Sequence, residues 1–228
     1  MKYQAIIFDL FGTLVDNISF QQSECVLSEM ADILHTPCQR FISTWIVDTW
    51  HMRASGAFLT LEACIEHICS LLGTHVERDS LQKACCIWSD FTIKALHPRP
   101  DAINVLTNLK SAGYKIGLIS DCAVEVQIHW PDTPLAHLID VSILSCSVQL
   151  KKPDPRIYQL ACEQLQILPW HCLYIGDGSS HELSGAANIG IHPVLLSGTE
   201  KDKDAIRPDA EMWSGQSISL LTDISVLI

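Results

Sequence analysis

The sequence predicts an α/β fold in which an open, Rossmann-like parallel sheet carries helices on both faces, with a helical subdomain inserted after the first strand. Three observations lead to this prediction. Short apolar runs end abruptly at polar residues, helical stretches separate these runs, and one long interval contains no convincing strand. Short strands that alternate with helices are typical of a parallel sheet covered on both faces.

Five apolar runs are expected to form the strands. They are QAIIFD at 4–9, KIGLISD at 115–121, VSILS at 141–145, CLYIGD at 172–177 and PVLLS at 193–197. Apolar residues recur at helical spacing over 102–112 and 158–165, and a third helix is expected after Asp177. Gly113 follows the first of these helices and Pro155 precedes the second, which are the positions these residue types favour.

The interval from residue 17 to residue 96 reads as several amphipathic helices, punctuated by Pro37, Gly56 and Gly73. It is too long to be a simple crossover between two strands, so we expect an inserted helical subdomain. The predicted division is therefore an α/β core over 1–16 and 97–228, with a helical unit over 17–96. Its tryptophans are expected to pack in the interior, with contact to a substrate as the alternative; they are Trp45, Trp50 and Trp88.

The composition limits the classes of function. Fifteen basic and 26 acidic residues give a net charge of −11, which argues against binding to nucleic acid or to an anionic membrane. The sequence shows neither an apolar run of about 18 residues nor a signal peptide. The ten cysteines form no zinc-type spacing, and most lie in apolar helical patterns as expected of buried thiols, among them Cys64, Cys69, Cys85 and Cys162. We expect a cytoplasmic protein that acts on a small molecule; the sequence leaves its oligomeric state open.

Polar residues gather at the carboxyl ends of the predicted strands. Asp9, Ser120 and Asp177 each end an apolar run or follow it directly, Asp121 comes next to Ser120, and Lys152 lies in the KKPDP segment that follows another run. In an open parallel sheet, ligands bind beyond this edge. The sequence therefore predicts that these side chains converge on one site.

The same residues resemble the four motifs of the haloacid dehalogenase (HAD) superfamily. Asp9 is followed by Gly12 and Thr13, Ser120 follows KIGLI, Lys152 opens a Lys-Pro-Asp-Pro segment, and Gly-Asp at 176–177 is followed by Glu182. The resemblance covers about 1–16 and 97–200, and the helical insert is placed like that family's first-type cap. Motif order, spacing and strand context all agree.

The resemblance implies a role for each of these residues. Asp9 would be the nucleophile that forms a covalent intermediate. Ser120 would bind an oxygen of the transferred group together with backbone N–H groups near Gly12, Thr13 and Asp121, and Lys152 would hold the nucleophile and neutralise developing charge. Mg²⁺ would be held by Asp9, Asp177 and the backbone carbonyl of Phe11, with Glu182 as a further acid in the metal shell.

Phe11 departs from the phosphatase pattern, which has an aspartate two residues after the nucleophile to protonate the leaving oxygen. Dehalogenases have an aromatic residue there, because a halide leaves without a proton, but they do not keep the Gly-Asp metal ligand. Phosphonatases would need a lysine from the cap, and neither Lys83 nor Lys94 stands in a recognisable motif.

The sequence is compatible with three functions. The first is a Mg²⁺-dependent hydrolase of the phosphoryl-transfer type that lacks its usual general acid and acts on a phosphorylated small molecule. The second is a hydrolase of carbon–halogen bonds similar to the 2-haloacid dehalogenases. The third is a catalytically silent protein that binds phosphate and metal.

Other polar residues near the motifs have simpler readings. Asp16 and Asp154 are expected in turns or helix caps, and Lys151 is expected to be a solvated charge. His181 could be a base but is expected to be a surface residue at the start of a helix. The KDKD run at 201–204 is expected to be a solvated loop.

Overall fold

The computed structural model describes residues 2–197 and 206–228. In it, six parallel strands form one sheet in the order β3-β2-β1-β4-β5-β6. The strands are β1 (Ala5–Phe8), β2 (Lys115–Ser120), β3 (Val141–Leu144), β4 (Cys172–Gly176), β5 (His192–Leu196) and β6 (Ser217–Ile218). The five predicted strands are thus confirmed, and β6 was not predicted. The KDKD run lies outside the described residues.

Alternate residues of the central strand β1 face opposite sides of the sheet and join two separate hydrophobic clusters. Ile6 and Phe8 belong to the cluster that includes α6, whereas Ala5 and Ile7 belong to the one that includes α9. All four side chains are fully buried. A strand covered on both faces reads as a continuous apolar run, which is why the segment before Asp9 has no polar alternation.

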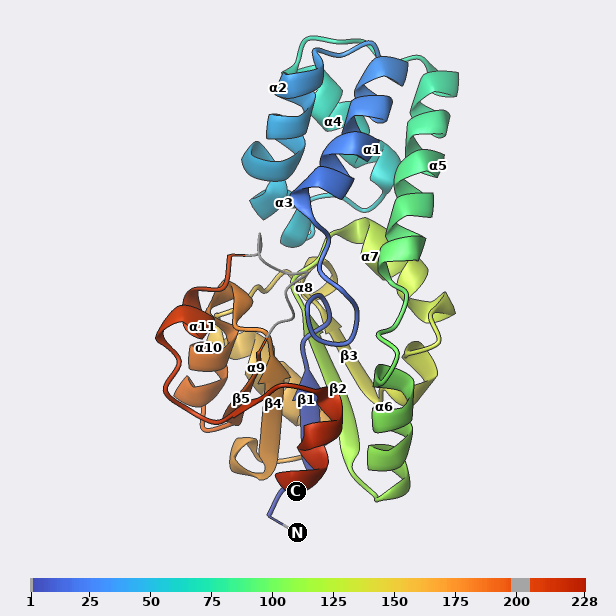
Figure 1. The fold of residues 1–228 in the computed structure, drawn as a ribbon. Coiled ribbons are helices and arrows are strands. Elements are labelled where there is room, and N and C mark those ends of the chain that lie inside the picture. The colour runs from blue at the N-terminus through green and yellow to red at the C-terminus, as the bar shows by residue number, and fades with distance from the viewer. Residues whose placement is uncertain (1, 198–205) are drawn as a thin grey trace.

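Helices cover both faces of this sheet, as predicted (Figure 1). The core helices are α6 (Ala102–Ser111), α7 (Val124–His129), α8 (Ser145–Val148), α9 (Pro155–Leu165), α10 (Glu182–Asn188) and α11 (Pro208–Met212). The Asp154 side chain caps α9 by accepting a hydrogen bond from the Arg156 N–H group, which confirms the expected cap.

Five helices and one π-helical turn fill the interval between β1 and α6. They are α1 (Phe20–Ile33), α2 (Cys38–Ser43), the π turn (Thr44–Asp48), α3 (Trp50–Ala54), α4 (Leu61–Leu71) and α5 (Arg78–Ala95). We call the unit formed by α1 to α5 the cap. It has a hydrophobic cluster of its own and lies over one end of the sheet (Figure 1). Pro37, Gly56 and Gly73 lie between these helices, as predicted. The exact boundaries at 16/17 and 96/97 stay a prediction.

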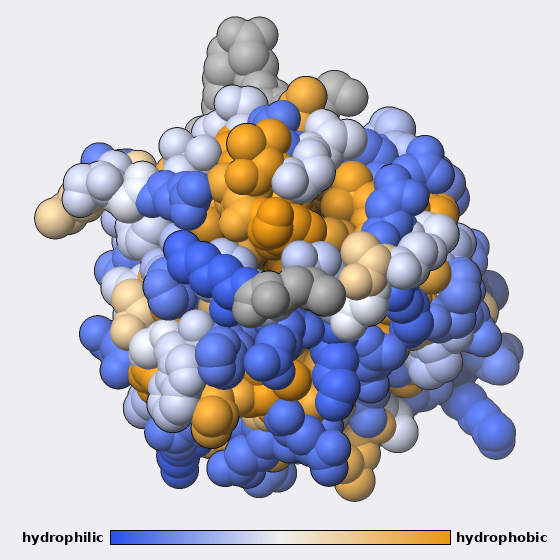
Figure 2. Space-filling view, turned by 90° about the horizontal axis from the view of Figure 1, so that it is seen from below, coloured by the Kyte–Doolittle hydropathy of each residue, from blue (hydrophilic) through white to orange (hydrophobic). Residues whose placement is uncertain are grey.

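The chain enters and leaves the cap at adjacent points. Val15 bridges Pro98, and the Arg99 N–H group donates to the Leu14 carbonyl at 2.9 Å. Both termini lie at the end of the sheet far from the cap (Figure 1). The face seen from that end is hydrophilic over most of its area, with smaller hydrophobic patches between (Figure 2). Nothing in the described chain forms a helix long and apolar enough to traverse a bilayer.

The cysteines are all free thiols, and the four expected to be buried are buried. The interiors of the cap and the core are thus formed without disulfides.

Candidate active site

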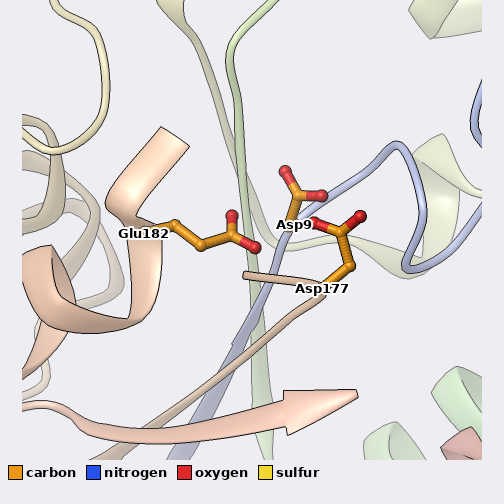
Figure 3. Close-up of side chains that lie close together, drawn as sticks. All are labelled: Asp9, Asp177 and Glu182. Atoms are coloured by element: carbon orange, nitrogen blue, oxygen red, sulfur yellow. The ribbon is translucent and has the colours of Figure 1, made fainter. Parts of the chain in front are cut away.

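The carboxyl ends of β1 and β4 bring two acidic side chains together. Asp9 follows β1 directly and Asp177 follows β4, and these two strands are neighbours in the sheet. Glu182 reaches the same point from the first turn of α10 (Figure 3). Each of the three offers a carboxylate oxygen within 4.8 Å of the others, and all three are buried. The sequence prediction that Asp9 and Asp177 converge is therefore confirmed in its geometry.

Lys152 links two of these carboxylates. Its Nζ atom lies 2.5 Å from Asp9 Oδ1 and 2.6 Å from Glu182 Oε2, and its side chain is 1% exposed. Burial acts to lower the pKa of Lys152, but the charges of Asp9 and Glu182 outweigh it and raise this pKa well above the usual value. The lysine is thus held as a cation between two acids.

Opposing effects act on the pKa of Asp9, and the net result is a raised value. Burial raises the pKa of its carboxyl, the charge of Lys152 lowers it and the charge of Asp177 raises it again, with a result of about 6. Above that pH, Asp9 is an ionised carboxylate, the form that a nucleophile needs. Thr13 donates to its second oxygen, Oδ2, at 3.4 Å.

Asp177 is held by donors that the sequence did not point to. Its Oδ2 atom accepts from Asn17 Nδ2 at 3.0 Å and from Arg207 Nε at 2.8 Å, while Oδ1 accepts from the Ser179 N–H group at 3.0 Å. Burial acts to raise the pKa of Asp177, but the Asn17 hydrogen bond and the Arg207 charge lower it below the usual value. No motif marked Asn17 or Arg207, because their contacts depend on the fold.

Both carboxylate oxygens of Glu182 accept hydrogen bonds. Oε2 accepts from Lys152 and, at 2.9 Å, from the Tyr174 hydroxyl, and Oε1 accepts from the Gly178 N–H group at 3.0 Å. Burial and the charge of Asp9 raise the pKa of Glu182 well above its usual value. These contacts suit a residue that positions Lys152 and the loop after β4; its place in a metal shell stays a prediction.

The carboxylate cluster has the chemistry of a site for a hard cation. Mg²⁺ prefers oxygen ligands and is usually held by one or two carboxylates together with waters and substrate oxygens. The Asp177 carboxylate has about four lone-pair sites and uses three of them, and Asp9 also keeps free acceptor capacity. Gly12 has φ +82°, and a β-carbon there would collide with Asp177 Oδ2, so glycine allows the close approach of the loop. The residues present therefore fit a magnesium ion.

The predicted group-binding residues lie around this cluster. The Ser120 side chain is buried, and its hydroxyl has no hydrogen-bond partner among the described residues. Asp121 accepts from the Lys152 N–H group at 3.0 Å through Oδ1, while its Oδ2 atom is buried without a partner in the described chain. Unpaired buried polar atoms are rare, and a bound ligand is one way to satisfy them. Their roles, like that of the Phe11 carbonyl, stay predictions.

A pocket of about 490 Å³ opens above Asp9 between the core and the cap. Core residues on its wall include Asp9, Phe11, Asp121 and Lys152, and cap residues include Arg53. All three cap tryptophans line it as well. Trp45 and Trp88 are buried in the cap cluster, as expected, whereas Trp50 is 38% exposed and departs from the expected interior packing.

Two charged residues on the pocket wall were not predicted from the sequence. Arg53 from α3 and Glu125 from α7 form a buried ion pair with Nη2 and Oε1 2.7 Å apart. Neither stands in a motif, and Arg53 lies in a short helix that also carries the polar His51, so no local pattern marked it. His181 is 60% exposed, contacts Asp209 at 3.4 Å and is not part of the pocket wall, as expected of a surface residue.

Comparison with known proteins agrees with this geometry. The chain is 28% identical over 202 residues to the (S)-2-haloacid dehalogenase 4A of Burkholderia cepacia, covering 85% of this chain and 82% of the relative. It is also 28% identical over 137 residues to the glyceraldehyde 3-phosphate phosphatase of Methanothermobacter thermautotrophicus, covering 58% of each.

Two solved structures share the fold at low identity. The L-2-haloacid dehalogenase of Xanthobacter autotrophicus, with chloropropionic acid covalently bound, superimposes with a TM-score of 0.63 at 17% identity, covering 99% of this chain and 98% of the other. A HAD family enzyme of Bacteroides thetaiotaomicron in complex with magnesium and inorganic phosphate gives a TM-score of 0.67 at 17% identity, covering 87% and 96%. The family model for haloacid dehalogenase-like hydrolases matches residues 3–190. The chain therefore belongs to the haloacid dehalogenase-like hydrolase family.

Proposed function

We propose that this hydrolase is a Mg²⁺-dependent phosphatase that acts on a phosphorylated small molecule through a covalent intermediate at Asp9. The observation that carries the proposal is the cluster of three buried carboxylates at the end of β1 and β4. Two cationic side chains, Lys152 and Arg207, contact this cluster, so three negative charges face two positive ones when all the groups are ionised. A divalent cation would compensate the excess negative charge and that of a bound phosphate.

The chemistry assigned to the chain is a double displacement. One carboxylate oxygen of Asp9 forms a bond to phosphorus while the bond from phosphorus to the leaving oxygen breaks, and the leaving group departs with the electron pair. Water then attacks phosphorus, which releases inorganic phosphate and restores the Asp9 carboxylate. Lys152 orients Asp9 and neutralises charge on the transferred group, and Ser120 donates to one of its oxygens. When bound, Mg²⁺ supplies Lewis-acid stabilisation of that charge.

Phe11 cannot donate a proton to the leaving oxygen. Its side chain lines the pocket beside Asp9, where a phosphatase of this family usually has the acid. The proposed enzyme therefore favours leaving groups that depart without protonation, such as aryl and acyl phosphates or phosphoanhydrides, over alkyl phosphates.

A 2-haloacid dehalogenase activity is the second candidate. The aromatic residue at position 11 and the similarity to the Burkholderia cepacia dehalogenase favour it. The charge of Asp177 opposes it. Although Asp177 is paired with Arg207, its carboxylate still raises the pKa of Asp9 and disfavours a carboxylate substrate beside it.

A screen of phosphate esters and 2-haloacids, each with Mg²⁺ and with EDTA, tests the proposal. We expect turnover of activated phosphate esters with Mg²⁺ only, and its loss in Asp9→Asn, which keeps the size of the side chain but not its charge. Dehalogenation that persists in EDTA would establish the second candidate instead. Thermal stabilisation by phosphate and Mg²⁺ without any turnover would indicate a binding protein.

A further inference from the structure

The half of the pocket that faces the cap is aromatic. Trp45, Trp50 and Trp88 contribute to its wall, together with the apolar side chains of Ile18, Ile46 and Val126. Trp45 and Trp88 pack edge to face, with ring centroids 4.7 Å apart and planes at 63°. Such a wall favours a flat apolar group, because offset and edge-to-face contacts between rings add to the burial of apolar area.

The charges in this half of the pocket are already paired. Arg53 donates to Glu125 Oε1 at 2.7 Å and to the Trp45 carbonyl at 3.2 Å, and its guanidinium lies 4.2 Å from the centroid of the Trp45 ring. Trp88 Nε1 donates to the same Glu125 oxygen at 3.0 Å. The ion pair is thus fixed from both sides, and it presents no net charge.

Two atoms of the ion pair have no hydrogen-bond partner in the described part of the chain. They are Nε of Arg53, a donor, and Oε2 of Glu125, an acceptor. Both residues are at least 95% buried and both line the pocket. One of these atoms is a donor and the other an acceptor, and both are buried, so they offer a second anion no unpaired positive charge.

The remaining charges of the pocket also disfavour a second anion. Among the described residues that line it, the cationic side chains are Arg53 and Lys152, and Lys152 is held between Asp9 and Glu182. Asp121 adds a carboxylate to the wall. Among the described residues that line this half of the pocket, a substrate with an anionic group in addition to its phosphate would find no unpaired cation; Lys151, outside the lining, lies with its amine 5.6 Å from the centroid of the Trp50 ring.

We infer that the cap half of the pocket is a leaving-group subsite for a neutral aromatic group, and that the Arg53–Glu125 ion pair sets its charge preference. The inference rests on the proposed function in placing the phosphate at Asp9. It narrows the substrate class to aryl phosphate monoesters without a further anionic group, and it excludes phosphorylated carboxylic acids.

Two non-hydrolysable probes of similar size test the charge preference without turnover. Phenylphosphonate carries a neutral ring and phosphonoacetate carries a second anion, and the quenching of tryptophan fluorescence in the presence of Mg²⁺ reports the binding of each. We expect the wild-type protein to bind phenylphosphonate at least about 10-fold more tightly, since close charge pairs and repulsions are worth more than 1.4 kcal/mol in partly buried sites. Absence of such a preference overturns the inference.

Glu125→Gln separates the charge from the shape of the subsite. The change leaves Arg53 as an uncompensated cation, so we expect phosphonoacetate to bind about 10-fold more tightly while the affinity for phenylphosphonate changes less than about threefold. If the single variant does not fold, Arg53→Met combined with Glu125→Gln restores a neutral wall and should keep the aromatic preference. An unchanged ratio in Glu125→Gln, or a lost preference in the double variant, overturns the role of the ion pair.

Trp50→Ala tests the aromatic wall, since Trp50 is the most exposed of the three tryptophans and its loss spares the cap interior. We expect phenylphosphonate to bind about threefold to 10-fold more weakly and phosphonoacetate to be unaffected. Trp170→Ala is the matched control, because Trp170 is 55% exposed and does not line the pocket. Equal effects of the two substitutions contradict the inference. Selective binding of phenylphosphonate without hydrolysis of any phosphate ester would leave the subsite intact and refute the phosphatase activity alone.

Discussion

Replacing Lys152 by methionine should destabilise the fold strongly, because this side chain neutralises two buried acids. Its ammonium lies 2.5 Å from an oxygen of Asp9 and 2.6 Å from an oxygen of Glu182, and none of the three side chains is more than 4% exposed. Removing one partner of a buried ion pair typically costs about 3–5 kcal/mol, because the other charge is left uncompensated. We expect a loss of that size in the free energy of unfolding at pH 7.5.

The loss should shrink in acid. Lys152 lowers the pKa of both Asp9 and Glu182, so its removal raises both values further. A carboxyl group with a raised pKa in the folded state takes up its proton at a higher pH than it does in the unfolded chain. Its protonation therefore stabilises the fold at low pH, and this stabilisation is lost as the pH rises through the folded pKa. The deficit of the variant relative to wild type is therefore smaller at pH 5 than at pH 7.5.

Urea denaturation followed by circular dichroism in EDTA measures both effects. The Lys151→Met variant is the matched control, since Lys151 is only half-buried and its amine lies 5.6 Å from the Trp50 ring. We expect it to lose less than about 1 kcal/mol. Adding Glu182→Gln to the Lys152 variant removes one of the two unpaired charges and should recover roughly half of the loss. A deficit below about 1 kcal/mol, or one that does not depend on pH, would refute the electrostatic account of this site.

Three further outcomes are expected. Phe11→Asp should raise kcat/KM for alkyl phosphates by about 10-fold or more and change it little for aryl phosphates; equal dependence on the pKa of the leaving group in both proteins would show that another residue already serves as the acid. Asp177→Asn should weaken the activation by Mg²⁺, and excess metal should partly restore it; activity that never needs a divalent ion would contradict the metal assignment. Asp140 accepts from Lys110 Nζ and from the Ile116 N–H group, both at 2.8 Å; although burial acts to raise its pKa, these contacts lower it. Asp140→Asn should therefore lower Tm by about 2–4 °C at pH 7. The difference in Tm between variant and wild type should vanish as the pH falls below about 4 through the folded pKa. A Tm difference that persists at pH 2.5 would rule out this ion pair as its cause.

The sequence by itself determined the parallel sheet, its helices and the convergence of Asp9, Lys152 and Asp177. These features follow from local patterns. A strand covered on both faces is a continuous apolar run, a helix repeats its apolar residues every three or four positions, and the polar residue that ends each run lies at one edge of the sheet. Strand β6 was not predicted, because its two residues, Ser217 and Ile218, are too few to form a recognisable pattern.

Only the tertiary structure decided how the charges of the site are paired. Arg53 and Glu125 are 72 residues apart in the chain, and Asp177 and Arg207 are 30 apart. Which cation compensates which buried acid depends on the tertiary fold, since charge pairing acts through space and leaves no period or spacing in the sequence. For the same reason, the sequence left open whether the cap tryptophans pack in the interior or contact a substrate. The structure buries Trp45 and Trp88, leaves Trp50 38% exposed and places all three on the pocket wall, because contact with the pocket depends on how the cap lies on the core.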